Sequence, residues 1–177
     1  MTTDPARYQK KRRLNHKIML MLTSLNSQRR IAKQLNCNLK TVARKLIYLG
    51  KKAFFAHEQA LIHQHYDADV IQFDELQTIE HTKCKPLAVA VAVTEKTRKI
   101  LAITVSSMPA TGHLSRIAKQ KYGYRPDDRR SGLMQLFETM KPVVTDKTRF
   151  VSDQHPYYKS ILRDYYPDAP YKQMKGS

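Results

Sequence analysis

Residues 86–107 contain two apolar, β-branched runs, and these most constrain the fold of the chain. In the first run, PLAVAVAVT, leucine and valine alternate with alanine, so both faces of the expected strand are apolar. A strand of this kind lies inside a sheet that is covered on both sides, and the alanines leave room for a close-packed helix. A polar turn over 95–99 separates it from the second run, ILAITVSS. The two runs therefore predict a β-hairpin.

The segments around this hairpin predict both strands and helices. VIQFDELQTI, at 70–79, is β-like, and RFVS, at 149–152, is a short strand candidate. Helices are expected over about 111–121 and from 127 or 128 to 141, the second with an aspartate as its N-cap. A Tyr-rich, helix-prone segment follows the last of these strands.

Before the first strand, the spacing of apolar residues is helical. Helices are expected over 14–25, 28–35 and 39–56. The boundary falls between His57 and Asp67, where the basic third helix gives way to a strand. We therefore expect an α+β chain in two parts: an all-α domain over 1–60, and an α/β domain with a mixed sheet over 67–177.

The charge of the chain points to a polyanionic partner. The 177 residues carry 32 Lys and Arg against 15 Asp and Glu, a net charge of +17. Residues 1–66 hold fourteen of the basic residues and only two acids, Asp4 and Glu58, a net of +12. Such an imbalance costs self-repulsion unless a polyanion binds, and the usual polyanion is nucleic acid. The more evenly charged remainder is typical of an ordinary globular domain.

Cysteine content and hydropathy indicate the cellular context. Cys37 and Cys84 lie far apart without CxxC spacing, which argues against a disulfide scaffold and a zinc finger and fits a reducing cytoplasm. No apolar run approaches the roughly 20 residues that span a bilayer. The start, MTTDPARYQKKRR, lacks the apolar stretch of a signal peptide. We expect a cytoplasmic protein without a membrane partner.

The segment QRRIAKQLNCNLKTVARKL, at 28–46, meets separate packing demands of a helix-turn-helix. Ile31 and Leu35 lie four residues apart on the inner face of the first helix, and Ala32 is small where the helices cross. Asn36 falls at the tight turn, where φ is positive and asparagine is well tolerated. The segment therefore predicts two helices joined by a short turn.

The second helix of the motif begins after Asn38, a good N-cap residue. Val42 and Leu46 are expected to face back toward the first helix. Cys37 is expected to be a small turn residue that faces the core. An amphipathic helical pair with a solvated basic face would share part of this pattern. The turn, the small crossing residue and the charge agree independently, and together they favour DNA binding.

DNA contacts are expected from the side chains at the start of the second helix and from the basic run before the first. The N-terminal end of the recognition helix meets base edges in the major groove of double-stranded DNA, and flanking basic residues meet phosphates. The expected DNA-binding residues are Arg12, Arg13, Asn38, Lys40, Thr41, Arg44, Lys45 and Tyr48.

Two aspartates stand out in the second domain. Asp74 lies in the middle of the first expected strand, and Asp153 ends the fourth. In a ribonuclease-H-like sheet the first and fourth strands are neighbours, which would bring both carboxylates side by side. Adjacent carboxylates repel each other unless a cation neutralises them, and hard oxygen ligands suit Mg²⁺ or Mn²⁺. Asp146 is an alternative second acid, but it precedes the strand instead of ending it.

The chain resembles the DDE transposases of bacterial insertion sequences, in particular those with a helix-turn-helix before a ribonuclease-H-like core. The resemblance rests on IAKQLNCNLKTVARKL, FDELQT and FVSDQHPYY and covers most of the chain. It implies that Asp74 and Asp153 are the first two catalytic acids and metal ligands. It also implies that the helix-turn-helix recognises the inverted repeats at the element's ends, where a complete enzyme cuts and joins DNA strands.

The family's third acid, usually Glu, lies on a helix beyond the second Asp. None of the residues after Asp153 is Glu, and YKQMKGS coincides with the expected start of a fifth strand. We therefore expect the ribonuclease-H-like domain to lack its last elements and the chain to be inactive as a catalyst alone. Its partners would be DNA, and either a missing C-terminal part or further copies of itself.

The alternative is a non-catalytic DNA-binding regulator whose second domain serves for dimerisation or ligand binding.

Some further side chains have weaker functional interpretations. Glu75 is expected on the opposite strand face from Asp74, as a surface or supporting residue. His155 could reach DNA phosphate or the metal, although an ordinary loop histidine is favoured. The tyrosines after Asp153 are expected to pack against the sheet rather than to stack on bases.

Overall fold

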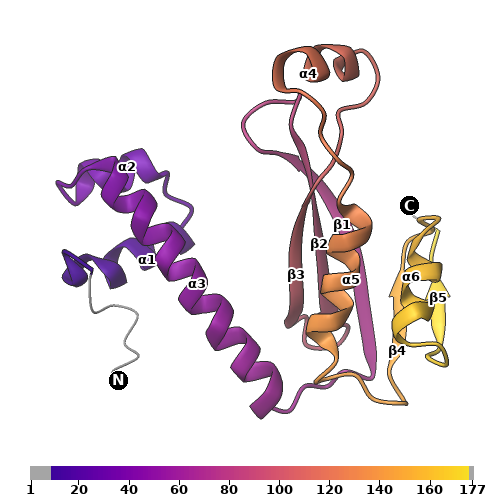
Figure 1. Ribbon diagram of the computed structural model, residues 1–177. Coiled ribbons are helices and arrows are strands. Elements are labelled where there is room, and N and C mark those ends of the chain that lie inside the picture. Colours follow the sequence, from indigo (N-terminus) through magenta and orange to yellow (C-terminus); the bar gives the residue numbers. More distant parts are fainter. Residues whose placement is uncertain (1–8, 176–177) are drawn as a thin grey trace. The chain divides into compact units, whose positions relative to one another are not determined.

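The computed structural model describes residues 9–175, which form six α-helices and a five-stranded mixed sheet (Figure 1). The chain divides into two compact units, Met1–Gln59 and Ala60–Ser177. The elements of the first unit are η1 (Arg12–Leu14), α1 (Asn15–Thr23), α2 (Gln28–Gln34) and most of α3 (Leu39–His63). Those of the second are β1 (Val70–Ile79), β2 (Pro86–Thr94), β3 (Ile100–Ser107), α4 (Leu114–Tyr122), α5 (Arg129–Met140), β4 (Arg149–Ser152), α6 (Tyr158–Tyr165) and β5 (Tyr171–Gln173).

The first unit is built around a small apolar core that α1, α2 and α3 share. Ile18, Ile31 and Val42 are fully buried in it, and the small Ala32 is also buried, as expected for a residue at a helix crossing. The expectation for Leu46 was wrong. Its side chain is 38% exposed, and Leu49, one turn further along α3, contacts the core instead.

Helix α3 is longer than its sequence suggested. A helix over 39–56 was expected, but α3 continues to His63. Its last turn carries Leu61, which is buried in the core of the second unit and anchors this end of the helix. The boundary between the compact units accordingly falls within the helix, between Gln59 and Ala60, rather than in a linker.

The strands lie in the order β3-β2-β1-β4-β5. β2 is antiparallel to both of its neighbours, whereas β1, β4 and β5 run parallel to one another. The structure confirms the hairpin that the sequence predicted, which is formed by β2 and β3. It also confirms the predicted strands at 70–79 and 149–152. The last pairing is that of β5 with β4, in the segment where a fifth strand was expected to begin.

One face of the sheet is covered by α5 and α6 (Figure 1). Three alanines of β2, at 88, 90 and 92, are buried on this face, as their small size predicted. Four aromatic side chains fill the core beside them, with ring centroids 5.2 to 6.5 Å from Phe73: Phe137, Phe150, Tyr158 and Tyr171. The alternation of apolar residues along the strands therefore explains the core between the sheet and helices α5 and α6.

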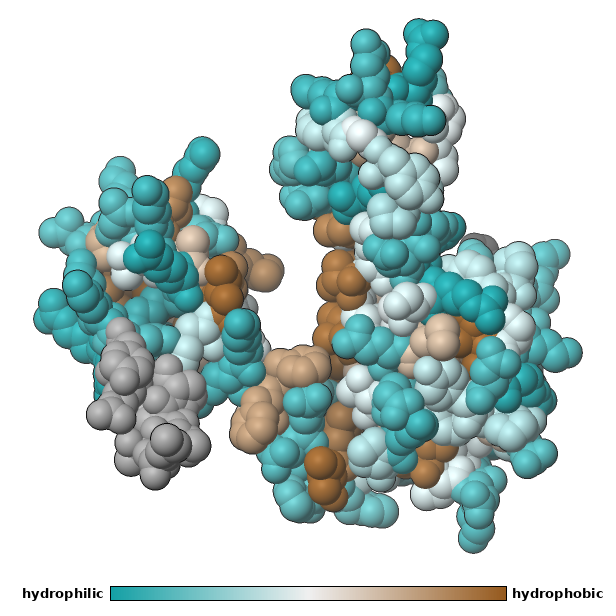
Figure 2. All heavy atoms as spheres, viewed as in Figure 1, coloured by the Kyte–Doolittle hydropathy of each residue, from teal (hydrophilic) through white to brown (hydrophobic). Residues whose placement is uncertain are grey.

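The other face of the sheet departs from the expectation of two-sided cover. Leu76, Val89 and Val105 are in register across β1, β2 and β3. Leu76 is 67% exposed and Val105 62% exposed, so no helix in the described part of the second unit covers this row. Figure 2 displays hydrophobic side chains along the β3 side of the sheet. The prediction of a second apolar face was therefore confirmed, whereas the prediction that a helix covers this face was not.

None of the helices in the described part of the chain combines the length and apolar content that a membrane span requires.

Candidate nucleic-acid interface and carboxylate site

The turn between α2 and α3 has the backbone geometry that the sequence predicted. Asn36 has φ 45°, in the left-handed region that asparagine tolerates better than most residues. The backbone N–H of Cys37 donates to the carbonyl of Ala32 at 3.0 Å, which closes the end of α2. Cys37 packs partly against the unit's core, as expected. The turn thus orients α3 across α2.

Both helices of this pair begin with a capping side chain. Ser27 Oγ accepts a hydrogen bond from the backbone N–H of Arg30 at 3.3 Å, at the start of α2. Asn38 Oδ1 accepts one from the backbone N–H of Lys40 at 2.8 Å, at the start of α3. These bonds satisfy backbone donors that a helix leaves unpaired at its first turn. The N-cap role of Asn38 is confirmed, and its contact with DNA stays a prediction.

The expected DNA-contacting side chains of α3 lie mostly on one helix face. Lys40, Arg44 and Tyr48 follow one another at intervals of four residues, so they share a face. Lys40 and Arg44 are exposed, and Thr41 and Tyr48 are half-buried. In the preceding 3₁₀ helix, Arg12 and Arg13 are also exposed. This arrangement presents positive charge at the N-terminal end of α3.

Lys45 was wrongly expected among these exposed residues. Its side chain is 5% exposed, and its Nζ donates a hydrogen bond to Gln9 Oε1 at 2.6 Å. Lys45 lies three residues after Val42 and four before Leu49, which both contact the core, so helical geometry turns it inward. Burial, with a further contribution from Arg12, lowers the pKa of Lys45. It therefore anchors the segment before α1, and its expected contact with DNA stays a prediction.

Asp74 and Asp153 lie at equivalent positions on neighbouring parallel strands. Gln72 of β1 is in register with Val151 of β4, and each aspartate follows two residues later. Side chains two residues apart in a strand point to the same face, so both carboxylates belong to the face that α5 and α6 leave uncovered. They line one pocket of about 460 Å³ together with residues of β2 and the segment after β5.

The surroundings of this pocket are a mixture of apolar and polar side chains. Val91 of β2 lies directly opposite Asp74 in the register, and Lys175 contributes a cation to the pocket's lining. Asp74 Oδ1 also accepts a hydrogen bond from the backbone N–H of Glu75 at 2.7 Å. Both aspartates are exposed, so their remaining oxygen lone pairs can be reached from solvent.

The resemblance implies a bound Mg²⁺ or Mn²⁺, and the two aspartates are suitable ligands for either ion. Mg²⁺ is usually held by one or two carboxylates, with waters and substrate phosphates completing its shell. Among residues 9–175 no group of three or more His, Cys, Asp and Glu side chains gathers for a metal. The alternative second acid, Asp146, does not line the pocket of Asp74 but a different one, beside Tyr165 and Tyr166.

Glu75 points to the other face of β1, as expected, but it is not simply a surface residue. Tyr157 Oη donates a hydrogen bond to Glu75 Oε2 at 2.7 Å. Arg129 lies over the Tyr157 ring at 5.9 Å and pairs with Asp127 at 2.6 Å. Burial, together with the bond to Glu75, raises the pKa of Tyr157. This polar network between β1, α5 and α6 was missed in the sequence, because its members are far apart along the chain.

The tyrosines after Asp153 pack, as the sequence favoured. Tyr158 is 1% exposed, and Tyr165 and Tyr166 contact the same core. His155 lies against Tyr157 and Tyr158, with ring centroids 4.0 and 5.0 Å apart. These side chains stabilise α6 on the sheet.

No protein-family model matches the chain, and no curated protein matches it significantly in sequence.

Proposed function

We propose that this chain is a DNA-binding protein of the DDE-transposase kind, or part of one. Helices α2 and α3 act as a helix-turn-helix that recognises the ends of a mobile element in double-stranded DNA. The sheet, interpreted as ribonuclease-H-like, carries two of the acids of a site that cuts and joins DNA strands. Because the resemblance assigns only two of three acids here, DNA binding is the activity proposed for the chain by itself.

The single observation that carries this proposal is the shared pocket of Asp74 and Asp153. The resemblance implies that these residues are ligands of one metal site. Their two motifs, FDELQT and FVSDQHPYY, lie far apart in the sequence. Their placement on one face of adjacent parallel strands is what that role requires, and carboxylates on opposite faces would have excluded it. The placement therefore supports a joint role.

The roles of individual residues follow from this assignment. Asp74 and Asp153 supply ligand oxygens, and a bound Mg²⁺ or Mn²⁺ would activate an attacking oxygen and stabilise a leaving one in phosphoryl transfer. Lys40 and Arg44 contact DNA at the start of α3, and Arg12 and Arg13 contact phosphates. Cys37 and Cys84 are both free thiols, which suits the cytoplasmic location that we propose.

Site-resolved Mn²⁺ binding tests the carboxylate assignment. In the full-length chain, substoichiometric Mn²⁺ should broaden the backbone NMR signals around Asp74 and Asp153 before any others. Asp74→Asn or Asp153→Asn should each abolish this selectivity, whereas the control Asp146→Asn should not change it. Broadening that is centred elsewhere, or that survives both substitutions, would exclude a shared metal site.

The regulator alternative is favoured by one observation, the uncovered apolar row of Leu76, Val89 and Val105. Such a row would suit a dimer interface between two copies of the sheet. Sedimentation of the wild type and of Val105→Lys distinguishes the two functions. A dimer that this substitution dissociates, combined with no Mn²⁺ binding, would favour the regulator.

A further inference from the structure

The excess positive charge of the second domain is concentrated at one end of it. Residues 67–177 hold eighteen Lys and Arg against thirteen Asp and Glu. Two segments, 80–85 and 108–126, contain six of these basic residues and one acid, so they account for the whole excess of five. The remaining residues hold twelve of each sign. We call these two segments the basic cap.

The two segments of the basic cap pack against each other, although they are distant in sequence. The loop between β1 and β2 contributes His81, whose ring lies 6.0 Å from that of Tyr122 on α4, and Lys85, whose Nζ lies 5.0 Å over the same ring. Arg125 donates hydrogen bonds to Glu80 Oε2 and to the carbonyl of Pro86, both at 3.4 Å. The basic side chains of both segments therefore lie together at one end of the second domain.

Most of this charge is not neutralised by acids in the described part of the chain. Glu80 is the only acid of the basic cap, and it pairs with Lys85 at 3.9 Å and Arg125 at 3.4 Å. The other four basic side chains are exposed and make no ion pair with an acid in the described residues: Lys83, Arg116, Lys119 and Lys121. Figure 2 displays hydrophilic side chains over the α4 end of the molecule.

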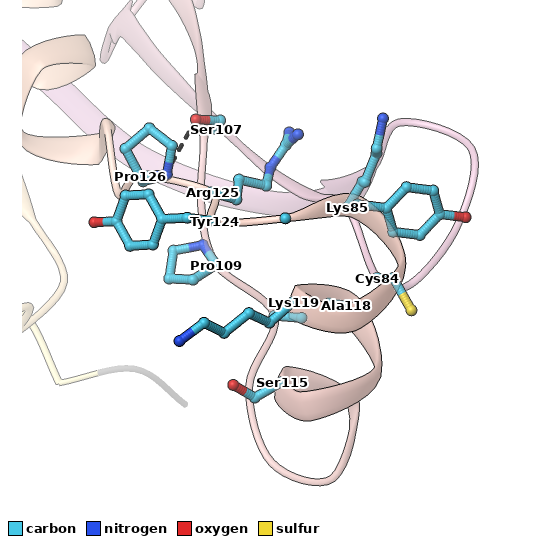
Figure 3. Close-up of a pocket in the computed structure, with 13 residues that line it drawn as sticks. Cys84, Lys85, Ser107, Pro109, Ser115, Ala118, Lys119, Tyr124, Arg125 and Pro126 are labelled. Atoms are coloured by element: carbon cyan, nitrogen blue, oxygen red, sulfur yellow. Dashed lines mark hydrogen bonds between the residues drawn. The ribbon is translucent and has the colours of Figure 1, made fainter.

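A pocket of about 430 Å³ opens within the basic cap, between α4, the β1–β2 loop and the segment after α4 (Figure 3). Lys85, Lys119 and Arg125 line it, together with Tyr122 and Tyr124. The Nε of Arg125 is buried and has no hydrogen-bond partner among the described residues. An unpaired guanidinium N–H is costly to bury, and an anionic oxygen in the pocket would satisfy it.

Tyr124 adds a second kind of contact beside these cations. Its side chain is 84% exposed, although a tyrosine ring gains free energy when it leaves water. Cations beside an exposed aromatic ring form the surface on which single-stranded nucleic acids bind, since phosphates meet the cations and unpaired bases stack on the ring. Bases inside a duplex do not offer their faces in this way.

We propose that the basic cap is a binding surface for single-stranded DNA, separate from α2 and α3. Phosphates lie along Arg116, Lys119 and Lys121 and at the pocket of Arg125, and a base stacks on Tyr124. The basic cap continues from the carboxyl end of β1, about 17 Å along the strand from Asp74. A strand held there can extend toward the carboxylate pocket, but the proposal depends on neither the metal nor the helix-turn-helix.

The test measures binding of a labelled oligothymidylate to the full chain by fluorescence anisotropy. Lys40→Ala and Arg44→Ala are present throughout, so that α3 contributes little. Adding Arg116→Ala, Lys119→Ala and Lys121→Ala should weaken binding at least tenfold and reduce the salt dependence by about two units of slope, roughly 0.7 for each phosphate that is no longer neutralised. The matched control is the removal of three exposed lysines outside the basic cap: Lys141, Lys147 and Lys159.

Substitutions of Tyr124 measure the contribution of base stacking to binding, apart from that of charge, in the same assay. Tyr124→Ala should weaken binding roughly tenfold, and Tyr124→Phe should leave it nearly unchanged, because the ring face is retained. All these positions are exposed, so the variants should keep the wild-type circular dichroism spectrum. Equal effects of the basic-cap and control substitutions would overturn the proposal. The proposal would also be overturned if a duplex of the same length bound as tightly as the single strand and Tyr124→Ala did not change the affinity for that duplex.

Discussion

Asp74 and Asp153 stand at matching positions on the parallel strands β1 and β4, two residues beyond the paired Gln72 and Val151. The two carboxylates line one pocket on the face of the sheet that α5 and α6 do not cover. Residues 79 positions apart in the sequence thus share one site because the strand order places β4 next to β1 rather than next to β3.

This proximity predicts that the two carboxylates repel each other in the absence of a divalent cation. Asp74→Asn should raise the free energy of unfolding at low ionic strength by up to about 1 kcal/mol, since it removes one of two like charges. The gain should shrink as salt is added. Urea denaturation at two salt concentrations measures it. Asp146→Asn is the control, and an equal gain in that variant would point to general charge effects.

The close approach of α5 to β3 predicts a specific cost for a methyl group at Gly132. A Cβ there would overlap the hydroxyl of Ser106, and the Gly132 carbonyl accepts a hydrogen bond from Thr104 Oγ1 at 3.0 Å. Gly132→Ala should therefore lower the free energy of unfolding by about 1 to 3 kcal/mol. In a Ser106→Ala background the cost should fall markedly. A double-mutant cycle measures this coupling, and additive effects would argue against the overlap.

The turn between α2 and α3 predicts opposite outcomes for two substitutions of Asn36. Its φ of 45° is unfavourable for alanine, so Asn36→Ala should lower the stability of the first unit by about 1 kcal/mol. Asn36→Gly should cost far less, because glycine adopts this conformation freely. Amide hydrogen exchange in α2 and α3 reports the stability of this unit. Equal loss of protection in both variants would contradict the backbone explanation.

Four tyrosines should titrate above their ordinary range in the folded protein. Burial raises the pKa of Tyr157, Tyr158, Tyr166 and Tyr171. A pKa raised on folding contributes stability that is present below the unfolded value, about 10, and is lost as the pH rises through the folded value. An ultraviolet titration should therefore show part of the tyrosine signal delayed until the chain unfolds at alkaline pH. In urea the delay should vanish, and a single transition in both states would contradict this account.

Local patterns determined most of the secondary structure. The alternation in PLAVAVAVT, the polar turn and the position of Asn36 each depend on neighbouring residues, and the structure agrees with all three. The alanines also predicted the close approach of a helix, which is α5.

The errors arose where distant contacts override local patterns. Lys45 looked like an exposed basic residue, yet Gln9, 36 residues earlier, accepts a hydrogen bond from it in the interior. Helix α3 continues past its expected end because Leu61 enters the core of the second unit. The network of Glu75 and Tyr157 joins residues 82 positions apart, so no short motif could reveal it. In contrast, the placement of Asp74 and Asp153 on neighbouring strands was expected from the strand order of a ribonuclease-H-like sheet, and in this sheet β4 does lie beside β1.

The most direct test of the account is a selection for binding sites from random duplex DNA by the full chain. The proposed function predicts that the wild type enriches a defined sequence, and that Lys40→Ala with Arg44→Ala abolishes this enrichment. Lys147→Ala with Lys159→Ala, which removes equal charge from the second unit, should leave the enriched sequence unchanged. Failure to enrich any sequence, or enrichment that persists without Lys40 and Arg44, would contradict the assignment of α2 and α3 as a helix-turn-helix that recognises DNA.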